Sequence, residues 1–442
     1  MEEAIAGQGN PFVDLEEGEL AGSGSHSRMS KSSLRRTRRK RQKLFKDKEK
    51  ADLEKIYHQG ISDGMNKILE SLYNGDNVHL HYVFKHPKLL VHLKAAEVRN
   101  RQPLCSDDPE IINANPKWLF QPGIHLCIDQ ESDEVVFAVR ISPWDQMSQK
   151  QKSHTQATLT ILMDCATAVP SITTNSAQQG TKGLHGDGIR FTKPYGIMKA
   201  VGWHHSFEKN KSIATYAPLP TPAALTVYKN VMPKLPQVAG MYRDRLCTLL
   251  PHAGRKMVEE SEELGIPSFA MLSLDASTTP QQPFANSLTL TYDDFANSLH
   301  QDNDFHAIAY GMWWASSSAG SQGPFSFEDA IDHDSIKGGH FFNGEFNIGV
   351  DFSRCQGLVE IFWRGKLDHH CTMKSTSAQG TTRWGTSVQI TQKGVNAIAA
   401  FRNKEDPTRS IDYYKRVANL AKKLDVICKK RKAMDEVEGQ EE

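Results

Sequence analysis

Two short motifs in this sequence could contribute ligands to a metal ion. The stretch NSLHQDND, residues 297–304, holds His300 and Asp302, and a second His-x-Asp pair stands at His185 and Asp187. Two histidines and one carboxylate on one face of an iron ion leave three positions open for a co-substrate and oxygen. Each motif would therefore need a later histidine, and a cation beyond it to pair with the carboxylate of the co-substrate.

The sequence after the earlier motif does not meet this requirement. The histidines that follow it, at His204, His205 and His252, lie in or beside segments with helical periodicity. No strand-like segment after them carries a well-placed arginine. The earlier motif therefore serves as an internal control.

The sequence after the later motif does meet it. The β-like segment LVEIFWRGKLDHHCTMKS contains His369 and His370, and Arg383 follows His370 by thirteen residues, at the start of another β-like segment. We therefore predict an iron site built from His300, Asp302 and one of these two histidines. The alternative is that all of them are structural or surface residues.

The elements that would position this set are predicted to be strands. The segments SLTLTYDD, FHAIAYGMWWA, GGHFFNGEFNIGVDF, GLVEIFWRG and TSVQIT are β-branched and aromatic, and Gly, Asp and Asn turns separate them. Helical periodicity marks residues 222–264 and Ser410 to Ile427. We predict an α+β chain with a double-stranded β-helix, or jelly-roll, core flanked by helices and preceded by a disordered basic tail.

Composition divides the chain into four parts. Residues 1–50 are predicted to be a disordered tail with a basic cluster, and residues 51–105 a helical N-terminal extension. Residues 106–400 would form the jelly-roll domain, including the helical region 222–264, and residues 401–442 a C-terminal helix with a charged tail.

Charge and cysteine content limit the class of protein. No apolar run of about 18 residues indicates a membrane span. The seven cysteines are scattered and never form CxxC, so neither a disulfide framework nor a zinc ribbon is indicated. Residues 31–50 carry eleven Lys/Arg against two acids, which is typical of a nuclear localisation signal or a nucleic-acid contact; a solvated tail is the alternative.

The motifs together resemble a known family. YDDFANSLHQDND, GGHFFNGEFNIGVDF, GLVEIFWRGKLDHHCTMKS and TRWGTSVQI, in that order, resemble the fungal branch of the TET/JBP oxygenases, most strongly over residues 185–395. These enzymes use Fe(II), 2-oxoglutarate and O2 to oxidise methylated bases in DNA. The resemblance implies that His300, Asp302 and His370 bind iron, since His370-Cys371-Thr372 matches the family's His-x-Thr pattern.

The resemblance also assigns the co-substrate. It implies that Arg383 receives the C5 carboxylate of 2-oxoglutarate, with Ser387 close by, and that His340 is a candidate contact to the same molecule. A structural role for His340 is the alternative.

Recognition of the base is expected to differ from that of the animal members. Where they place an Asn or Asp three residues beyond the metal-binding Asp, this chain has Phe305. The substitutes that we predict for substrate binding are Asn303, Asp304 and Asp334. Further candidates are Arg190, Lys193 and Lys199 for phosphates and, for base stacking, aromatic residues that could equally form the core: Trp203, Trp313, Trp314, Phe341 and Phe342.

The expected function is oxidation of the 5-methylcytosine methyl group to hydroxymethyl, formyl and carboxyl forms, on a base flipped out of the duplex. The expected partner is methylated double-stranded DNA, and a nuclear, monomeric protein without membrane contact is expected. The alternatives are demethylation of N6-methyladenine by the same chemistry, a protein-hydroxylating oxygenase, and an inactive chromatin- or transposon-associated DNA-binding protein.

Overall fold

The structure is a computed structural model that describes residues 77–172, 191, 193, 195–274, 283–317, 325–327, 330–403 and 409–438. Several predictions fall outside these residues: the tail with its basic cluster, residues 51–76 of the expected helical extension, the control motif at His185, and Arg190.

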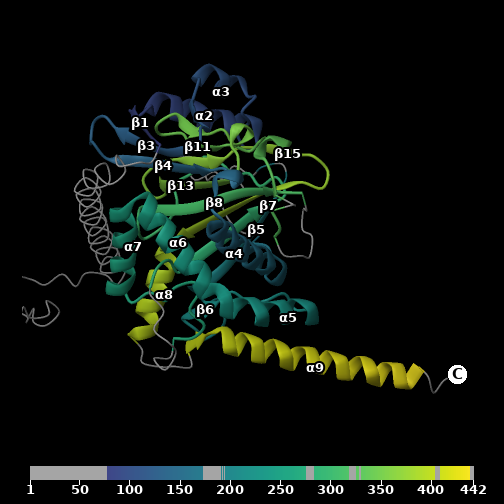
Figure 1. Ribbon diagram of the computed structural model, residues 1–442. Helices are drawn as coiled ribbons and strands as arrows, with labels where there is room; N and C mark the ends of the chain where they lie inside the picture. Colours follow the sequence, from purple (N-terminus) through teal and green to yellow (C-terminus); the bar gives the residue numbers. More distant parts are fainter. Residues whose placement is uncertain are drawn as a thin grey trace, which may run out of the picture. The chain divides into compact units, whose positions relative to one another are not determined.

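The core of the fold is one large mixed sheet (Figure 1). In spatial order its strands are β1 (Val78–Val83), β3 (Gly123–Asp129), β4 (Val135–Ser142), β13 (Leu358–Arg364), β8 (Ile308–Ser316), β16 (Thr382–Gln389), β7 (Ser287–Tyr292), β5 (Ile197–His205), β6 (Ile213–Thr215) and β17 (Ser410–Ile411), with β9 (Ala330–Ile331) paired to β8. Pairing is antiparallel from β3 through β6, and β1 and β17 add parallel edges.

A smaller sheet packs against one face of the large one. It consists of β14 (His370–Thr372), β11 (Phe341–Asn343), β12 (Ile348–Val350) and β2 (Lys117–Leu119), and a two-stranded sheet joins β10 (Ile336–Gly338) to β15 (Ser375–Ser377). Between the two sheets lies a buried cluster that includes Phe137, Trp313, Phe341 and Trp363. Two sheets closed over a common apolar layer form the predicted jelly roll, so the expected α+β fold class is confirmed.

Helices cover the outer faces of both sheets. The largest buried cluster joins the other face of the large sheet to α4 (Gln149–Ala168), α5 (Pro222–Val231), α6 (Leu235–Leu249) and α7 (Pro251–Glu263). The smaller sheet is covered by α2 (Pro87–Asn100) and α3 (Pro109–Ala114), and the chain ends with α8 (Gln392–Arg402) and α9 (Tyr413–Glu438). Short 3-10 turns occur at η1 (Trp144–Gln146), η2 (Met232–Lys234), η3 (His333–Ser335) and η4 (Phe352–Arg354).

Local sequence explains where most of these elements begin. Proline stands in the first turn of α2, α3, α5, α6 and α7, where its missing N–H costs nothing. Helix α4 was not predicted, because its first half is polar. A capping box between Ser148 and Gln151 starts it, and the buried residues Leu159, Ile161 and Leu162 fix its second half to the sheet.

One strand lies where only helix was expected. Residues 78–83, inside the expected helical extension, form β1 and pair in parallel with β3, while α2, in the same extension, is helical as expected. Residues 78–83 therefore belong to the large sheet, which the expectation of a helical extension did not include.

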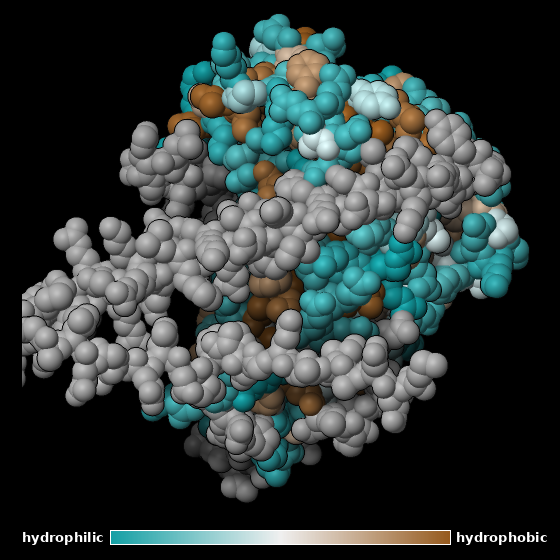
Figure 2. All heavy atoms as spheres, turned by 90° about the vertical axis from the view of Figure 1, so that its left-hand side faces the viewer, coloured by the Kyte–Doolittle hydropathy of each residue, from teal (hydrophilic) through white to brown (hydrophobic). Residues whose placement is uncertain are grey.

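On the face shown in Figure 2, hydrophilic residues predominate and hydrophobic ones form small groups between them. Among the described residues, no helix combines the length and the apolar character that a membrane crossing requires.

Candidate metal centre and its pocket

Three predicted ligands meet where the smaller sheet begins. His300 and His370 form an antiparallel bridge, with backbone N···O distances of 3.0 and 2.9 Å. Asp302 lies two residues further, and its two carboxylate oxygens are each 3.3 Å from one histidine Nε2. Among the described residues, this is the one group of histidine, cysteine and carboxylate side chains that converges closely enough to hold a metal ion.

Backbone carbonyls decide which ring nitrogen of each imidazole carries the hydrogen. His300 Nδ1 lies 2.7 Å from the oxygen of Ser298, and His370 Nδ1 lies 3.0 Å from the oxygen of Asp368. A carbonyl oxygen only accepts, so each Nδ1 carries the proton and each Nε2 presents a lone pair toward Asp302. This is the arrangement that metal-binding histidines require.

The electrostatics of the group favour a carboxylate in its charged form. Burial alone would raise the pKa of Asp302, but His370 and His300 together hold it well below its usual range. Burial likewise opposes charge on His300, and the hydrogen bond and charge of Asp302 outweigh it, so the pKa of His300 is raised. A buried carboxylate that draws positive charge toward itself suits a divalent cation.

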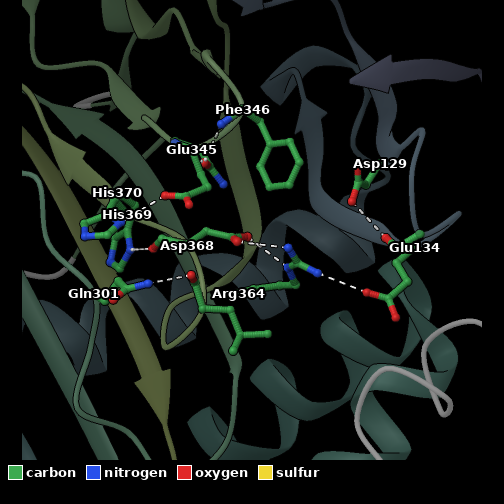
Figure 3. Close-up of polar contacts among 12 residues, drawn as sticks. Asp129, Glu134, Gln301, Glu345, Phe346, Arg364, Asp368, His369 and His370 are labelled. Carbon is green, nitrogen blue, oxygen red and sulfur yellow. Dashed lines mark hydrogen bonds and ion pairs between the residues drawn. The ribbon is translucent and has the colours of Figure 1, made fainter. Parts of the chain in front are cut away.

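A buried ion-pair network holds the loop that leads to His370 (Figure 3). Arg364 donates from Nε and Nη2 to the two oxygens of Asp368, both at 2.9 Å, and from Nη1 to Glu134 at 3.0 Å. Asp368 in turn supplies the carbonyl that accepts from His370. Each of the three charged side chains is less than 5% exposed, so the network fixes the histidine through its neighbour.

The side chain of the neighbouring His369 forms hydrogen bonds outside the triad. Its Nδ1 lies 2.9 Å from Glu345 Oε2 and its Nε2 lies 3.0 Å from Lys94 Nζ. The structure therefore places His370, and not His369, in the triad.

A pocket opens beside the triad. Its flat walls are the aromatic rings of Phe295, Trp313, Phe341 and Trp363, and its other lining residues are Met198, Thr289, Thr291, Asn297, Thr372, Thr386, Ser387 and Gln389. Phe341 stacks on His370 with ring centroids 5.9 Å apart. Ser387 is one of the lining residues, with its hydroxyl 2.8 Å from that of Thr289, and its contact to 2-oxoglutarate stays a prediction.

Arg383 lies outside the residues that line the pocket. Its guanidinium donates to the carbonyls of His333, Ile336 and Gly338 and to His333 Nδ1, at 2.7–3.1 Å. Burial lowers its pKa to about 10. Two residues beyond Arg383 on the same strand lies Gly385, and the side chain of Trp313 fills the space next to it, since a Cβ on that glycine would lie 2.6 Å from the indole nitrogen. The pairing of Arg383 with a co-substrate carboxylate stays a prediction.

The structure does not bring His340 into the pocket. Its ring packs on Trp118 at 5.0 Å, and its Nδ1 is 3.4 Å from Asp351. Burial lowers the pKa of His340 to about 4, so the ring is neutral at pH 7. It lies on the opposite face of the strand from Phe341 because side chains alternate along a strand.

The residues predicted to read the base are also not gathered there. Asn303 and Asp334 are exposed and lie outside the pocket lining. Asp304 is buried, and burial together with the charge of Asp302 raises its pKa well above the usual range. None of the three contacts the pocket, so their role in substrate binding stays a prediction.

The candidates for stacking and phosphate contact divide into two groups. Trp313 and Phe341 line the pocket, whereas Trp203, Trp314 and Phe342 are fully buried core residues. Lys193 is exposed, but Lys199 is buried and donates to the carbonyl of Val169 at 2.8 Å, which removes it as a phosphate contact.

Comparison with protein families decides the identity of this site. Residues 148–375, just over half of the chain, match the model of the Tet-like 2OG-Fe(II) oxygenase superfamily, and the match contains the whole triad. The chain belongs to the Tet-like 2OG-Fe(II) oxygenase superfamily. A comparison with curated proteins finds no match.

The cofactors of this family are Fe(II), 2-oxoglutarate and O2, and the residues present fit the metal. Two imidazoles and one carboxylate are the ligand set of non-haem iron oxygenases. The chain is therefore a 2-oxoglutarate-dependent dioxygenase, as predicted. Arg383, Ser387 and Gln389 lie beyond the matched segment.

Sequence reasoning missed one side chain at the metal centre. Gln389 donates from Nε2 to Asp302 Oδ2 at 2.9 Å. A signal for it was present, because Arg383, Ser387 and Gln389 are separated by even numbers of residues on one predicted strand and must share its face.

Proposed function

We propose that this oxygenase oxidises the methyl group of 5-methylcytosine in DNA, first to hydroxymethyl and then, in further cycles, to formyl and carboxyl. The family establishes the dioxygenase, and the resemblance of the ordered motifs to the fungal TET/JBP enzymes supports the substrate.

The observation that carries the proposal is the shape and chemistry of the pocket. The residues that line it include four aromatic side chains, the three metal ligands and two carboxamides. Such a lining suits a planar heterocycle, which can lie between rings while polar groups contact its edge.

The protein's own residues hold the metal, orient the substrate and exclude water. His300, Asp302 and His370 would hold iron, which when bound supplies with 2-oxoglutarate and O2 the oxidising power that converts C–H to C–OH while succinate and carbon dioxide leave. Phe341, Trp313 and Trp363 exclude water around the methyl group, so that oxidation is directed to the substrate.

A base can reach this buried site only after leaving the duplex, which costs a few kcal/mol of stacking and pairing. Stacking on the pocket aromatics would offset part of this cost. The basic cluster at Arg35 to Arg41 would add sequence-independent phosphate contacts and a nuclear address, and we propose a nuclear protein that acts as a monomer.

The test uses synthetic duplexes that carry either 5-methylcytosine or N6-methyladenine at one position. We expect iron- and 2-oxoglutarate-dependent conversion of 5-methylcytosine to its oxidised forms, detected by mass spectrometry of the nucleosides. Conversion of N6-methyladenine alone would replace the proposed substrate. Turnover of neither base would remove DNA as the substrate.

A further inference from the structure

Two carboxamides, Asn297 and Gln389, line the pocket beside the metal centre. A carboxamide is a donor on its nitrogen side and an acceptor on its oxygen side. Its partner therefore decides which side remains for a ligand. In this pocket the two amides have partners of opposite kinds.

A hydrogen-bond acceptor fixes the orientation of the Gln389 side-chain amide. Its Nε2 lies 2.9 Å from Asp302 Oδ2, and an ionised carboxylate can only accept a hydrogen bond. The NH2 group must face Asp302, so the carbonyl oxygen is the side left over. That oxygen has no hydrogen-bond partner in the part of the chain that the structure describes.

A hydrogen-bond donor fixes the orientation of the Asn297 side-chain amide. The backbone N–H of Thr372 donates to Asn297 Oδ1 at 2.6 Å, and the backbone N–H of Asn297 donates to the carbonyl of Thr372 at 3.1 Å. A backbone N–H cannot accept, so the oxygen of the amide faces Thr372 and its NH2 is the side left over. Within the described ranges, Asn297 Nδ2 has no partner.

We propose that these two amides read the edge of the substrate base: Gln389 accepts from an exocyclic amino group, and Asn297 donates to the ring nitrogen next to it. The inference rests on the proposed function and names the class of base that the pocket selects. It also supplies the contact that Phe305 cannot make.

The chemistry of methylated bases fits this pair. In 5-methylcytosine the amino group is on the ring carbon next to the one that bears the methyl group, and ring nitrogen N3 follows it. A methyl group directed at the metal therefore brings the amino group close to the residue that holds Asp302. N6-methyladenine also offers an N–H beside a ring acceptor.

Thymine carries the same methyl group but the opposite pattern. It presents a carbonyl oxygen where cytosine has an amine, and an N–H where cytosine has an acceptor. Gln389 would then face oxygen with oxygen, and Asn297 would face a donor with a donor. A pocket whose polar groups are left unpaired rejects a substrate strongly, so thymine is excluded in spite of its methyl group.

The experiment compares three bases in otherwise identical single-stranded oligonucleotides, which removes differences in pairing: 5-methylcytosine, thymine and 5-methylpyrimidin-2-one, which lacks the amino group. For the wild-type protein we expect kcat/KM for 5-methylcytosine to exceed that of each of the other two at least 100-fold.

Two variants locate the discrimination. Asn297→Asp keeps the acceptor for Thr372 and replaces the donor with an acceptor, so the preference for 5-methylcytosine over thymine should fall at least tenfold. Gln389→Met removes the acceptor, and the preference over 5-methylpyrimidin-2-one should fall similarly. Ratios between bases on one preparation cancel any loss of metal, which an iron titration measures separately.

Equilibrium binding of the same oligonucleotides, followed by fluorescence anisotropy without turnover, should show the same losses of preference. Matched controls on the surface of α8 are Asn396→Asp and Gln392→Met, which should retain the wild-type ratios.

The outcomes separate this inference from the proposed function. If wild type oxidises 5-methylcytosine but treats the base without an amino group equally well, or if both variants retain the wild-type ratios, the inference is overturned and the proposed function stands. If wild type oxidises no methylated base, the proposed function fails and the inference fails with it.

Discussion

At the scale of single residues, the metal centre depends on groups that are close without being ligands. Gly365 is one, because its carbonyl accepts from the backbone N–H of Asp302 at 2.8 Å. A Cβ on Gly365 would lie 2.6 Å from Asp302 Oδ2 and 3.2 Å from the indole nitrogen of Trp363. Any side chain larger than that of glycine would therefore push on the carboxylate of Asp302.

The substitution Gly365→Ala should therefore displace Asp302 and weaken Fe(II) binding at least tenfold, which corresponds to about 1.4 kcal/mol. The measurement is a metal titration followed by calorimetry, with circular dichroism to show that the fold persists. Gly240→Ala is the matched control, since nothing lies within 4 Å of the added Cβ there. Unchanged affinity in Gly365→Ala would refute the crowding argument.

Only part of the site could be predicted from the types and spacing of the residues. His300, Asp302 and one of the two histidines at 369 and 370 could be predicted because their types and order suit iron, and the choice of His370 came from the resemblance. Strand alternation places Gln389 on the same face as Arg383 and Ser387, but its contact with Asp302 depends on which strands lie side by side. The same holds for the ion pairs of Arg364, and no local pattern encodes that arrangement. Asp334 and Asn303 were chosen by type alone, and the fold leaves both on the surface.

At the scale of elements, three histidines lie where strand β1 pairs with strand β3 of the large sheet. His79 and His125 are register partners with stacked rings 4.6 Å apart, and His81 Nε2 lies 3.0 Å from His125 Nδ1. Burial, aided by nearby Lys117, lowers the pKa values of His81 and His125 to about 4. Both rings are neutral in the folded chain at neutral pH.

The histidines at this edge of the sheet should make the free energy of unfolding decrease in acid. Because the folded-state pKa values lie below the ordinary 6.5, the unfolded chain binds more protons between pH 6.5 and 4. The stabilisation is present above pH 6.5 and is lost as pH falls toward 4, by up to about 1.4 kcal/mol per pH unit for the buried His125.

The measurement is urea unfolding at several pH values, with a chelator present so that metal release does not contribute. The double variant His81→Gln, His125→Gln should lose less stability than wild type over this pH range. His154→Gln, on the exposed side of α4, should behave like wild type. Parallel curves for wild type and the double variant would contradict the explanation.

The elements themselves were predictable where periodicity was strong. The strands of the second half and the helices of residues 222–264 appear where they were expected. Strand β1 and helix α4 were missed for physical reasons: β1 is stabilised by its partner β3, and the first half of α4 is too polar to show an apolar face.

At the scale of the whole molecule, the charge distribution concerns DNA. The formal net charge of +1 hides six Lys/Arg between Arg35 and Arg41. If this cluster binds phosphates, its contribution is electrostatic and independent of sequence.

Replacement of these six residues by Gln in the full chain should weaken binding to unmethylated duplex DNA at low salt. It should also flatten the dependence of log K on log salt by about 0.9 for each phosphate that the cluster neutralises in the wild-type complex. Fluorescence anisotropy across a salt series measures both. An unchanged slope would assign the cluster to nuclear import or to a solvated tail.

The central claim is that His300, Asp302 and His370 hold iron for 2-oxoglutarate-dependent oxidation of methylated DNA. The most direct measurement is iron content per chain together with succinate released from 2-oxoglutarate, with and without a duplex that carries 5-methylcytosine. Wild type should bind one iron and release succinate faster with the methylated duplex, and Asp302→Ala should lose both. Iron content and succinate release that are unchanged in Asp302→Ala would contradict the account.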